Sequence, residues 1–327
     1  MFWLFVIGMA HAWLLWEGDI LVAYSLCGAM VAWWVRRLPI GWLGVIAAAF
    51  FLVHVTLSFS QYLSVWMAFG EHGSPPLGMP QPDYEAMRDG MKQFMAPTPA
   101  MLEEDLAAHR GSWSDVFAAR AQANQFIQIS GFFFYNFWRS TAMMILGIIL
   151  MRTGVFTGHR TPRFYASMAA ICYAVGLPLV IFGLIDNERH GFDIIRMALV
   201  GTQTNIIGSV PVALGHAAVL LLLVRLGALG GLRKALAATG QMALTNYLSQ
   251  TILCTTLFYG YGLGLYGKLD RPATLGIVAA IWTLQLIWSP LWLSRFRFGP
   301  AEWAWRTLTY FKAPRVLRTP DDRIAAE

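Results

Sequence analysis

The chain has 327 residues, of which 57% are hydrophobic and only 13% are charged, and its mean hydropathy is +0.52. Soluble domains carry about 25% charged residues, so this composition excludes an ordinary soluble domain and indicates an integral membrane protein. The net charge of +6 does not indicate a nucleic-acid partner, because long apolar runs leave no soluble basic face for a phosphate backbone.

Apolar runs along the chain predict an all-α polytopic protein embedded in the lipid bilayer. A transmembrane helix needs about 20 predominantly apolar residues. About eight such runs are found, at roughly 1–16, 20–35, 40–67, 126–151, 164–185, 204–226, 241–261 and 273–294.

The charges between these runs predict the topology. Most of the 24 Lys and Arg residues lie in the segments that share a side with the N-terminus, namely 36–39, 152–163, 225–240 and the tail from 295. Basic residues concentrate on the cytoplasmic side of a membrane. We therefore expect both termini to be cytoplasmic.

The large polar segment between the third and fourth runs then lies outside the cytoplasm as a helical insertion. Thr98-Pro99 is typical of an N-cap followed by a first helical position, and either Ser112 or Ser114 is expected to begin another helix. Pro300 is expected to open an interfacial helix near the C-terminus. The predicted parts are spans one to three at 1–67, the extracytoplasmic helical segment at 68–125, spans four to six at 126–226, spans seven and eight with the interfacial helix at 240–312, and a cytoplasmic tail at 313–327.

His11 lies in the outer half of the first predicted span, and the acidic turn that follows holds Glu17 and Asp19. A histidine near carboxylates can act as a general base, since such neighbours tune its pKa and orient its ring. Two other interpretations are open. His11 can instead join neighbouring spans by hydrogen bonds, and the two acids can cap the next helix.

Arg139 lies near the middle of the fourth predicted span, too deep for its side chain to reach either membrane surface. It is predicted to have a buried partner and to be able to bind a negative group. Asn136, one turn earlier on the same face, and Gln128, about three turns outward, are the candidate substrate-binding residues beside it. A structural role for Arg139, bound to carbonyl groups at a helix break, is the alternative.

The remaining polar residues in the predicted spans favour packing roles. His54 and His216 have no carboxylate companion in the sequence, and Asn246 and Gln250 are expected to join helices. The three cysteines show no metal-ligand spacing, so no metal site is predicted. No nucleotide-binding or hydrolase motif is found in a usable context, and no cofactor is evident.

Several sequence blocks resemble one bacterial family. GQMALTNYLSQT, FYGYGLGL, SPLWL and RFRFGPAEWAWR, all within 240–306, look like the C-terminal domain of the YeiB-like family, known as domain of unknown function 418. HAWLLWEGDILVAYSLCG at 11–28 and RSTAMMILGIILMRTGVF at 139–156 resemble two further blocks of that family.

The resemblance implies a multi-pass protein of the bacterial cytoplasmic (inner) membrane, distantly similar to transmembrane acyltransferases. Those enzymes carry an acyl group to an extracytoplasmic sugar or lipid hydroxyl, which would here imply an acyl-CoA donor. His11 would then be the base, oriented by Glu17 or Asp19, and Arg139 would stabilise the oxyanion.

One departure from the family concerns the N-terminus. Family members begin with further spans and a D-x-x-R-G-like segment, and none precedes His11 in this chain. If that segment contributes to catalysis, the chain is expected to be incomplete or inactive.

Two other functions remain open. A transporter or exporter would use Arg139 to bind a small anionic or lipid-linked solute midway through the bilayer. A non-catalytic membrane protein would use its buried polar groups only to join helices. The sequence leaves the oligomeric state open.

Overall fold

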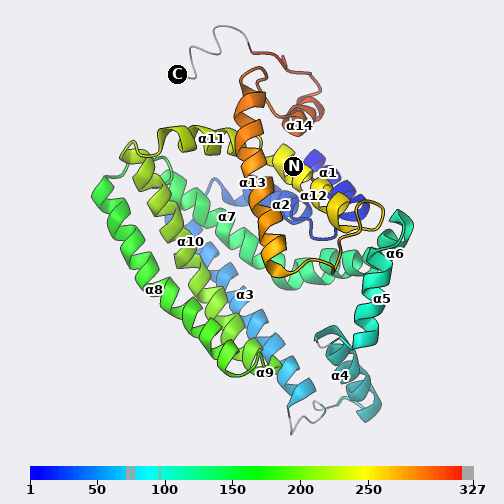
Figure 1. The fold of residues 1–327 in the computed structure, drawn as a ribbon. Coiled ribbons are helices and arrows are strands. Elements are labelled where there is room, and N and C mark those ends of the chain that lie inside the picture. The colour runs from blue at the N-terminus through cyan, green and yellow to red at the C-terminus, as the bar shows by residue number, and fades with distance from the viewer. Residues whose placement is uncertain (71–74, 76–77, 96, 319–327) are drawn as a thin grey trace. The chain divides into compact units, whose positions relative to one another are not determined.

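The computed structural model describes residues 1–70, 75, 78–95 and 97–318, and the regular elements in these ranges are helices (Figure 1). Contacts within the chain divide it into two compact units. The first unit comprises Met1–Ala29, Glu103–Ile129 and Leu229–Glu327, and the second comprises Met30–Leu102 and Ser130–Ala228. Each unit is therefore assembled from segments that are distant in the sequence.

The first unit holds both ends of the described chain. Its helices are α1 (Phe2–Leu14), α2 (Leu21–Met30), most of α5 (Pro99–His109), α6 (Trp113–Phe126), α11 (Gly230–Gln241), α12 (Ala243–Phe258), α13 (Arg271–Leu293) and α14 (Pro300–Tyr310). Within this unit, α1 contacts α6 and α14, and α12 contacts α14.

The second unit is built on long apolar helices. Its elements are the π-helical segment η1 (Val31–Val35), α3 (Ile40–Phe69), α4 (Gln81–Met95), most of the π-helical segment η2 (Ile127–Asn136), α7 (Phe137–Arg152), α8 (Pro162–Arg189), α9 (Ile194–Arg196), the π-helical segment η3 (Met197–Gly201) and α10 (Thr202–Arg225). Val31, Val35, Leu43 and Ile145 form a buried core where η1, α3 and α7 meet.

Five helical stretches are long and apolar enough to cross a membrane, in agreement with five of the eight predicted spans. They are Ile40–Met67, Trp113–Arg152, Pro162–Arg189, Ile194–Arg225 and Arg271–Leu293. The predicted spans at 1–16, 20–35 and 241–261 contain shorter helices, of which α1 has 13 residues and α12 has 16. At about 1.5 Å of rise per residue, these helices are shorter than a hydrocarbon core of about 30 Å. The eight-span topology and the cytoplasmic termini stay predictions.

The predicted starts of two helices between the third and fourth spans, and of one helix near the C-terminus, are confirmed. Thr98 Oγ1 accepts a hydrogen bond of 3.3 Å from the backbone N–H of Met101 at the start of α5. Ser112, not Ser114, is the N-cap of α6, where it forms a capping box with Asp115. Pro300 opens α14 as predicted. Capping residues are therefore readable from the sequence because their hydrogen bonds are local.

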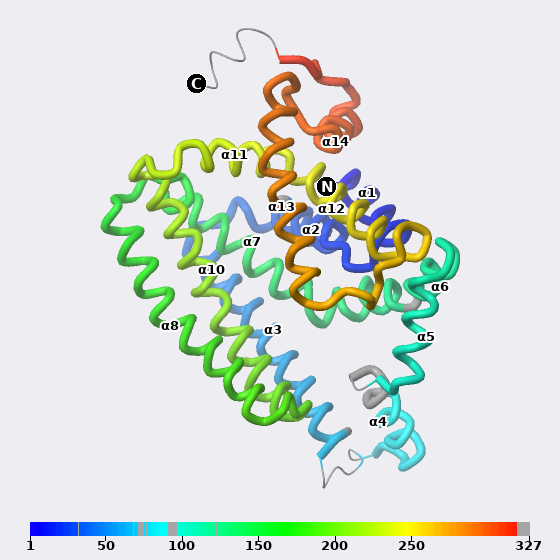
Figure 2. The backbone as a smooth tube through the Cα atoms, viewed as in Figure 1, coloured from blue at the N-terminus to red at the C-terminus, as the bar shows by residue number. Residues whose placement is uncertain are grey.

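Close packing of α8 against α10 depends on glycine, and Figure 2 shows the two helices side by side. A Cβ atom added to Gly208 would lie 3.0 Å from the carbonyl oxygen of Gly176, and one added to Gly176 would lie 2.8 Å from the carbonyl oxygen of Gly208. Small residues of this kind let two helix backbones approach closely in a bilayer.

The amides of α12 join it to α13, as the sequence predicts. Asn246 Nδ2 donates to Ser289 Oγ at 3.1 Å, and its Oδ1 accepts from the indole N–H of Trp288 at 2.8 Å. Gln250 Nε2 donates to Gln285 Oε1 at 2.8 Å. These bonds hold α12 against α13.

Candidate functional site

The end of α1 and the start of α2 bring a histidine and a carboxylate together in the first unit. The backbone carbonyl of His11 accepts hydrogen bonds from the N–H groups of Leu15 and Trp16, which close the last turn of α1. Asp19 lies at the other end of the turn, where Oδ2 accepts a 2.8 Å bond from the N–H of Val22 in α2. Asp19 therefore caps α2, as one of the sequence interpretations expected.

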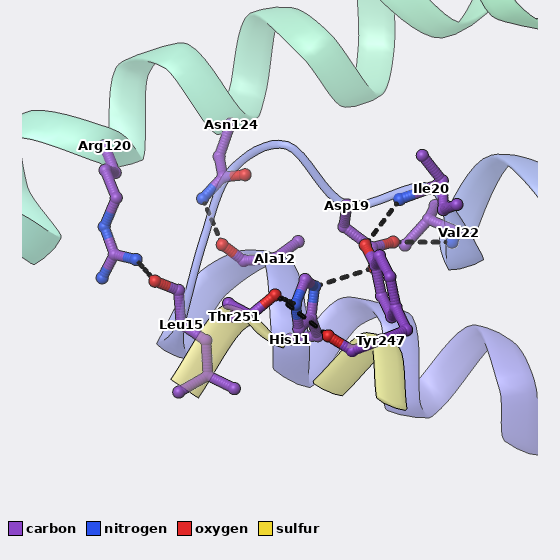
Figure 3. A network of polar contacts seen from close by, with 10 residues as sticks. All are labelled: His11, Ala12, Leu15, Asp19, Ile20, Val22, Arg120, Asn124, Tyr247 and Thr251. Carbon is purple, nitrogen blue, oxygen red and sulfur yellow. Dashed lines mark hydrogen bonds and ion pairs between the residues drawn. The ribbon is translucent and has the colours of Figure 1, made fainter. Parts of the chain in front are cut away.

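The His11 ring lies between two oxygen atoms (Figure 3). Its Nδ1 lies 2.9 Å from Asp19 Oδ1, in an ion-pair contact that is not aligned as a hydrogen bond. Its Nε2 lies 2.9 Å from Thr251 Oγ1 of α12. The side chains of His11 and Asp19 are both 1% exposed, so water does not compete for these contacts.

A tyrosine holds the carboxylate in place. The Tyr247 hydroxyl donates to Asp19 Oδ1 at 3.2 Å and accepts from the N–H of Ile20, also at 3.2 Å. The Tyr247 ring lies against the His11 ring with 4.9 Å between centroids. Asp19 thus contacts a backbone N–H, a phenol and an imidazole, which together fix its orientation.

Nδ1 of His11 faces the Asp19 carboxylate, whose oxygens accept hydrogen bonds but do not donate them when ionised. When the proton of the neutral ring is on Nδ1, Nε2 is an acceptor that faces the Thr251 hydroxyl. That hydroxyl also lies 3.4 Å from the carbonyl oxygen of Tyr247, but its shorter contact is to the imidazole. The three groups lie in the order hydroxyl, imidazole and carboxylate, which is also the order in a Ser-His-Asp triad.

Thr251 and Tyr247 also line a pocket of about 510 Å³ in the first unit, a size in the usual range for small-molecule sites. Its wall is mostly apolar and aromatic. The other lining residues are Trp16, Gln250, Cys254, Thr255, Phe258, Tyr259, Tyr266 and Gly267. The Thr251 side chain therefore stands between the pocket and the His11 ring.

Tyr266 belongs to the glycine-rich turn after α12 and is anchored by α5. Its hydroxyl donates to Asp105 Oδ2 at 3.2 Å, and its ring stacks on His109 with 4.6 Å between centroids. Burial and the neighbouring Asp105 carboxylate raise the pKa of Tyr266 to about 12. The phenol is therefore neutral at physiological pH and acts as a hydrogen-bond donor.

Glu17 and Arg120 lie near Tyr259, which lines the pocket. The Arg120 guanidinium lies 5.7 Å from the Tyr259 ring centroid and donates to the carbonyl oxygens of Leu15 and Val116. Glu17 Oε2 is buried and has no hydrogen-bond partner among the described residues. The structure thus gives the two predicted acids different places, with Asp19 rather than Glu17 against the imidazole.

Other predicted site residues lie in different surroundings. Arg139 and Asn136 belong to the second unit, where Arg139 Nη2 donates to Ser209 Oγ of α10 at 2.9 Å. His54 interacts electrostatically with Arg139, and neither of its ring nitrogens has a hydrogen-bond partner in the described part of the chain. Gln128 belongs to the first unit, and its Nε2 is buried without a described partner.

Sequence reasoning missed Thr251 and Tyr247 as members of the site. Thr251 could not be linked to His11 from the sequence, because 240 residues separate the two and no local pattern connects them. Within α12, Tyr247 and Thr251 are one turn apart and share a face. The Thr251 hydroxyl and the Tyr247 phenol on one face of a helix were the only sequence features that could have indicated the site. No group of three or more His, Cys, Asp or Glu residues that could hold a metal occurs within the described ranges.

Comparisons with known proteins agree with the resemblance in the sequence. Residues 150–312 match the family described as "Protein of unknown function (DUF418)". The chain is 28% identical to the uncharacterized protein YeiB of Escherichia coli, over 97% of this chain and 76% of YeiB. It is 27% identical to the uncharacterized protein YxaH of Bacillus subtilis, over 94% of this chain and 70% of YxaH. No solved structure matches.

Proposed function

We propose an activity from the site itself, namely acyl transfer to a sugar or lipid hydroxyl outside the cytoplasm, because the family model that residues 150–312 match describes proteins of unknown function. The observation that carries the proposal is the imidazole of His11, held between Asp19 and a hydroxyl at the wall of a pocket. Acyl transfer requires a base that removes a proton from a hydroxyl group.

His11 is that base in the proposal. With the proton on Nδ1, Nε2 presents its lone pair to an O–H group, and Asp19 stabilises the imidazolium that forms. The carboxylate needs no rearrangement during the reaction, because Val22 and Tyr247 already hold it. Pre-set charges of this kind favour a transition state in which positive charge develops on the ring.

The pocket supplies the place for the acyl donor. Its aromatic and apolar wall suits an acyl chain, and Gln250, Tyr247 and Tyr266 provide polar groups along it. An acyl thioester such as acyl-CoA is the proposed donor class. The proposal uses residues of the first unit alone, and the predicted role of Arg139 in stabilising an oxyanion stays a prediction.

Acyl inventories of whole cells test the proposed function. Bacteria that express the full chain and bacteria that express His11→Ala are compared by mass spectrometry of their membrane lipids and extracytoplasmic glycans. We expect acyl-bearing species that rise with the wild-type chain and not with His11→Ala. The control is His216→Ala, since His216 is exposed and, among the described residues, its ring forms a hydrogen bond with the carbonyl oxygen of Val212 in its own helix and no contact with a carboxylate. Identical inventories for wild type and His11→Ala would refute the proposal.

Binding of a small anionic solute, as in a transporter, is a second candidate function that rests on the second unit. Arg139, Ser209 and His54 form a polar group on three long apolar helices. A half-buried cation within apolar helices favours a negative ligand. If this is its role, Arg139→Leu abolishes solute-dependent changes in the labelling of a single cysteine introduced at position 54, and Arg139→Lys retains them.

A further inference from the structure

The hydroxyl that faces His11 belongs to Thr251 of the protein and not to an acceptor molecule. His11 could therefore deprotonate Thr251 before it deprotonates an acceptor. Thr251 Oγ1 occupies the acceptor position of Nε2 at 2.9 Å, while its side chain lines the pocket. An acceptor hydroxyl from a sugar or lipid would have to displace it before contacting the base. The enzyme's own hydroxyl is already in place.

We propose that Thr251 is a nucleophile that carries the acyl group as a covalent ester during transfer. This inference rests on the proposed function, because it names an intermediate of that reaction. The structural basis is the chain of contacts from Thr251 Oγ1 through the His11 ring to Asp19 Oδ1, with both distances at 2.9 Å. A nucleophile bonded to a base that a third group orients is the signature of covalent catalysis.

The first half of the reaction forms the ester. Thr251 Oγ attacks the carbonyl carbon of an acyl thioester in the pocket, and His11 Nε2 takes the hydroxyl proton. The carbon–sulfur bond breaks, and the thiolate leaves with that proton as a free thiol. The acyl group is then bonded to Thr251 Oγ, and His11 is neutral again.

The second half releases the acyl group. The acceptor hydroxyl enters the space that the thiol has left, and Nε2 takes its proton as its oxygen attacks the ester carbonyl. The bond from the carbonyl carbon to Thr251 Oγ breaks, and Oγ regains a proton from His11. No oxidant, reductant or further co-reactant is needed, since the two halves exchange one acyl group and one proton.

The position of Thr251 in α12 favours this role. Asn246 and Gln250 bind α13, so the helix that carries Thr251 is held on the face next to the pocket. Tyr247, one turn earlier, binds both Asp19 and the N–H of Ile20. The same helix therefore positions the nucleophile and the group that orients its base, which keeps their separation fixed.

Trapping of the ester tests the inference in the full chain. The purified protein in lipid vesicles is incubated with a radiolabelled acetyl or longer acyl thioester without acceptor, denatured, digested and analysed by mass spectrometry. We expect an acyl group on Thr251 in the wild type and on the serine in Thr251→Ser. Thr251→Val keeps the shape of the side chain and removes the hydroxyl, so it should carry no label at position 251. Its rate of acyl transfer should fall by a factor on the order of 100 or more.

Further variants separate a failure of the Thr251 nucleophile from a failure of the proposed function. Thr283→Val makes the same chemical change at an exposed threonine, whose hydroxyl donates to the carbonyl oxygen of Ala279 in α13, and it should label and transfer like the wild type. If Thr251→Val transfers at the wild-type rate while His11→Gln does not, His11 acts on the acceptor directly, and the nucleophile is refuted with the proposed function intact. If both variants transfer normally, the proposed function fails as well. Label on Cys254, which also lines the pocket, would overturn the role of Thr251.

Discussion

Asp19 performs two tasks in the first unit. Its Oδ2 caps α2 through the N–H of Val22, and its Oδ1 contacts both the His11 ring and the Tyr247 hydroxyl. The sequence placed a histidine and two carboxylates close together, and this much could be predicted from the short turn between two helices. It could not decide between Glu17 and Asp19, because the direction of each side chain depends on contacts with α6 and α12, which come from distant parts of the chain.

Asp19→Asn separates the two tasks. An amide oxygen can still accept from Val22, so α2 keeps its cap, but the side chain loses the charge that stabilises an imidazolium. If the amide N–H faces His11, the proton of the ring moves to Nε2, which then no longer accepts from a hydroxyl. We expect acyl transfer to fall on the order of 100-fold or more, measured as a rate in vesicles.

The control for this change is Asp270→Asn. Asp270 caps α13 by accepting a 2.9 Å bond from the N–H of Ala273, and it lies outside the candidate site. This variant should transfer at close to the wild-type rate. Equal rates for the two variants would show that the Asp19 charge has no part in the reaction.

At the level of helices, local signals were readable and long-range ones were not. The starts of α5, α6 and α14 follow from Thr98, Ser112 and Pro300, whose capping preferences act within one turn. The partner of each helix does not follow from the sequence, since apolar faces in a bilayer look alike. The pairing of α8 with α10 depends on glycine backbones that only the structure brings into contact.

Gly208→Leu tests that pairing. The added side chain would meet the Gly176 carbonyl and the Val180 and Leu179 side chains of α8. We expect the free energy of unfolding to fall by about 1–3 kcal/mol, the usual cost of overpacking, measured by denaturant titration in detergent. Gly147→Leu is the control, because a Cβ at Gly147 in α7 has nothing within 4 Å. A drop of the same size in both variants would argue against close α8–α10 packing.

At the scale of the whole molecule, the all-helical class and a membrane location could be predicted from composition and apolar runs alone. Five of the helices expected to span are long enough to do so. The division into two compact units could not be predicted, because the first unit draws on three separate parts of the chain. Contacts between such parts leave no periodic signal in the sequence.

Reporter fusions test the predicted topology. The distribution of Lys and Arg predicts that a fluorescent protein fused after residue 318 folds in the cytoplasm, and that alkaline phosphatase inserted near residue 98 is active outside it. Inactive phosphatase at that position, with high activity when it is fused at the C-terminus, would show the opposite orientation.

Whether His11 acts as the base is tested most directly by the rate of thiol release from an acyl thioester in vesicles that hold the full chain and an acceptor hydroxyl. Wild type, His11→Gln and His216→Gln are compared at equal protein content. We expect a rate about 10²–10⁴-fold lower for His11→Gln and an unchanged rate for His216→Gln, because His11, unlike His216, faces a hydroxyl and a carboxylate. Equal rates for His11→Gln and wild type would show that His11 is not the base.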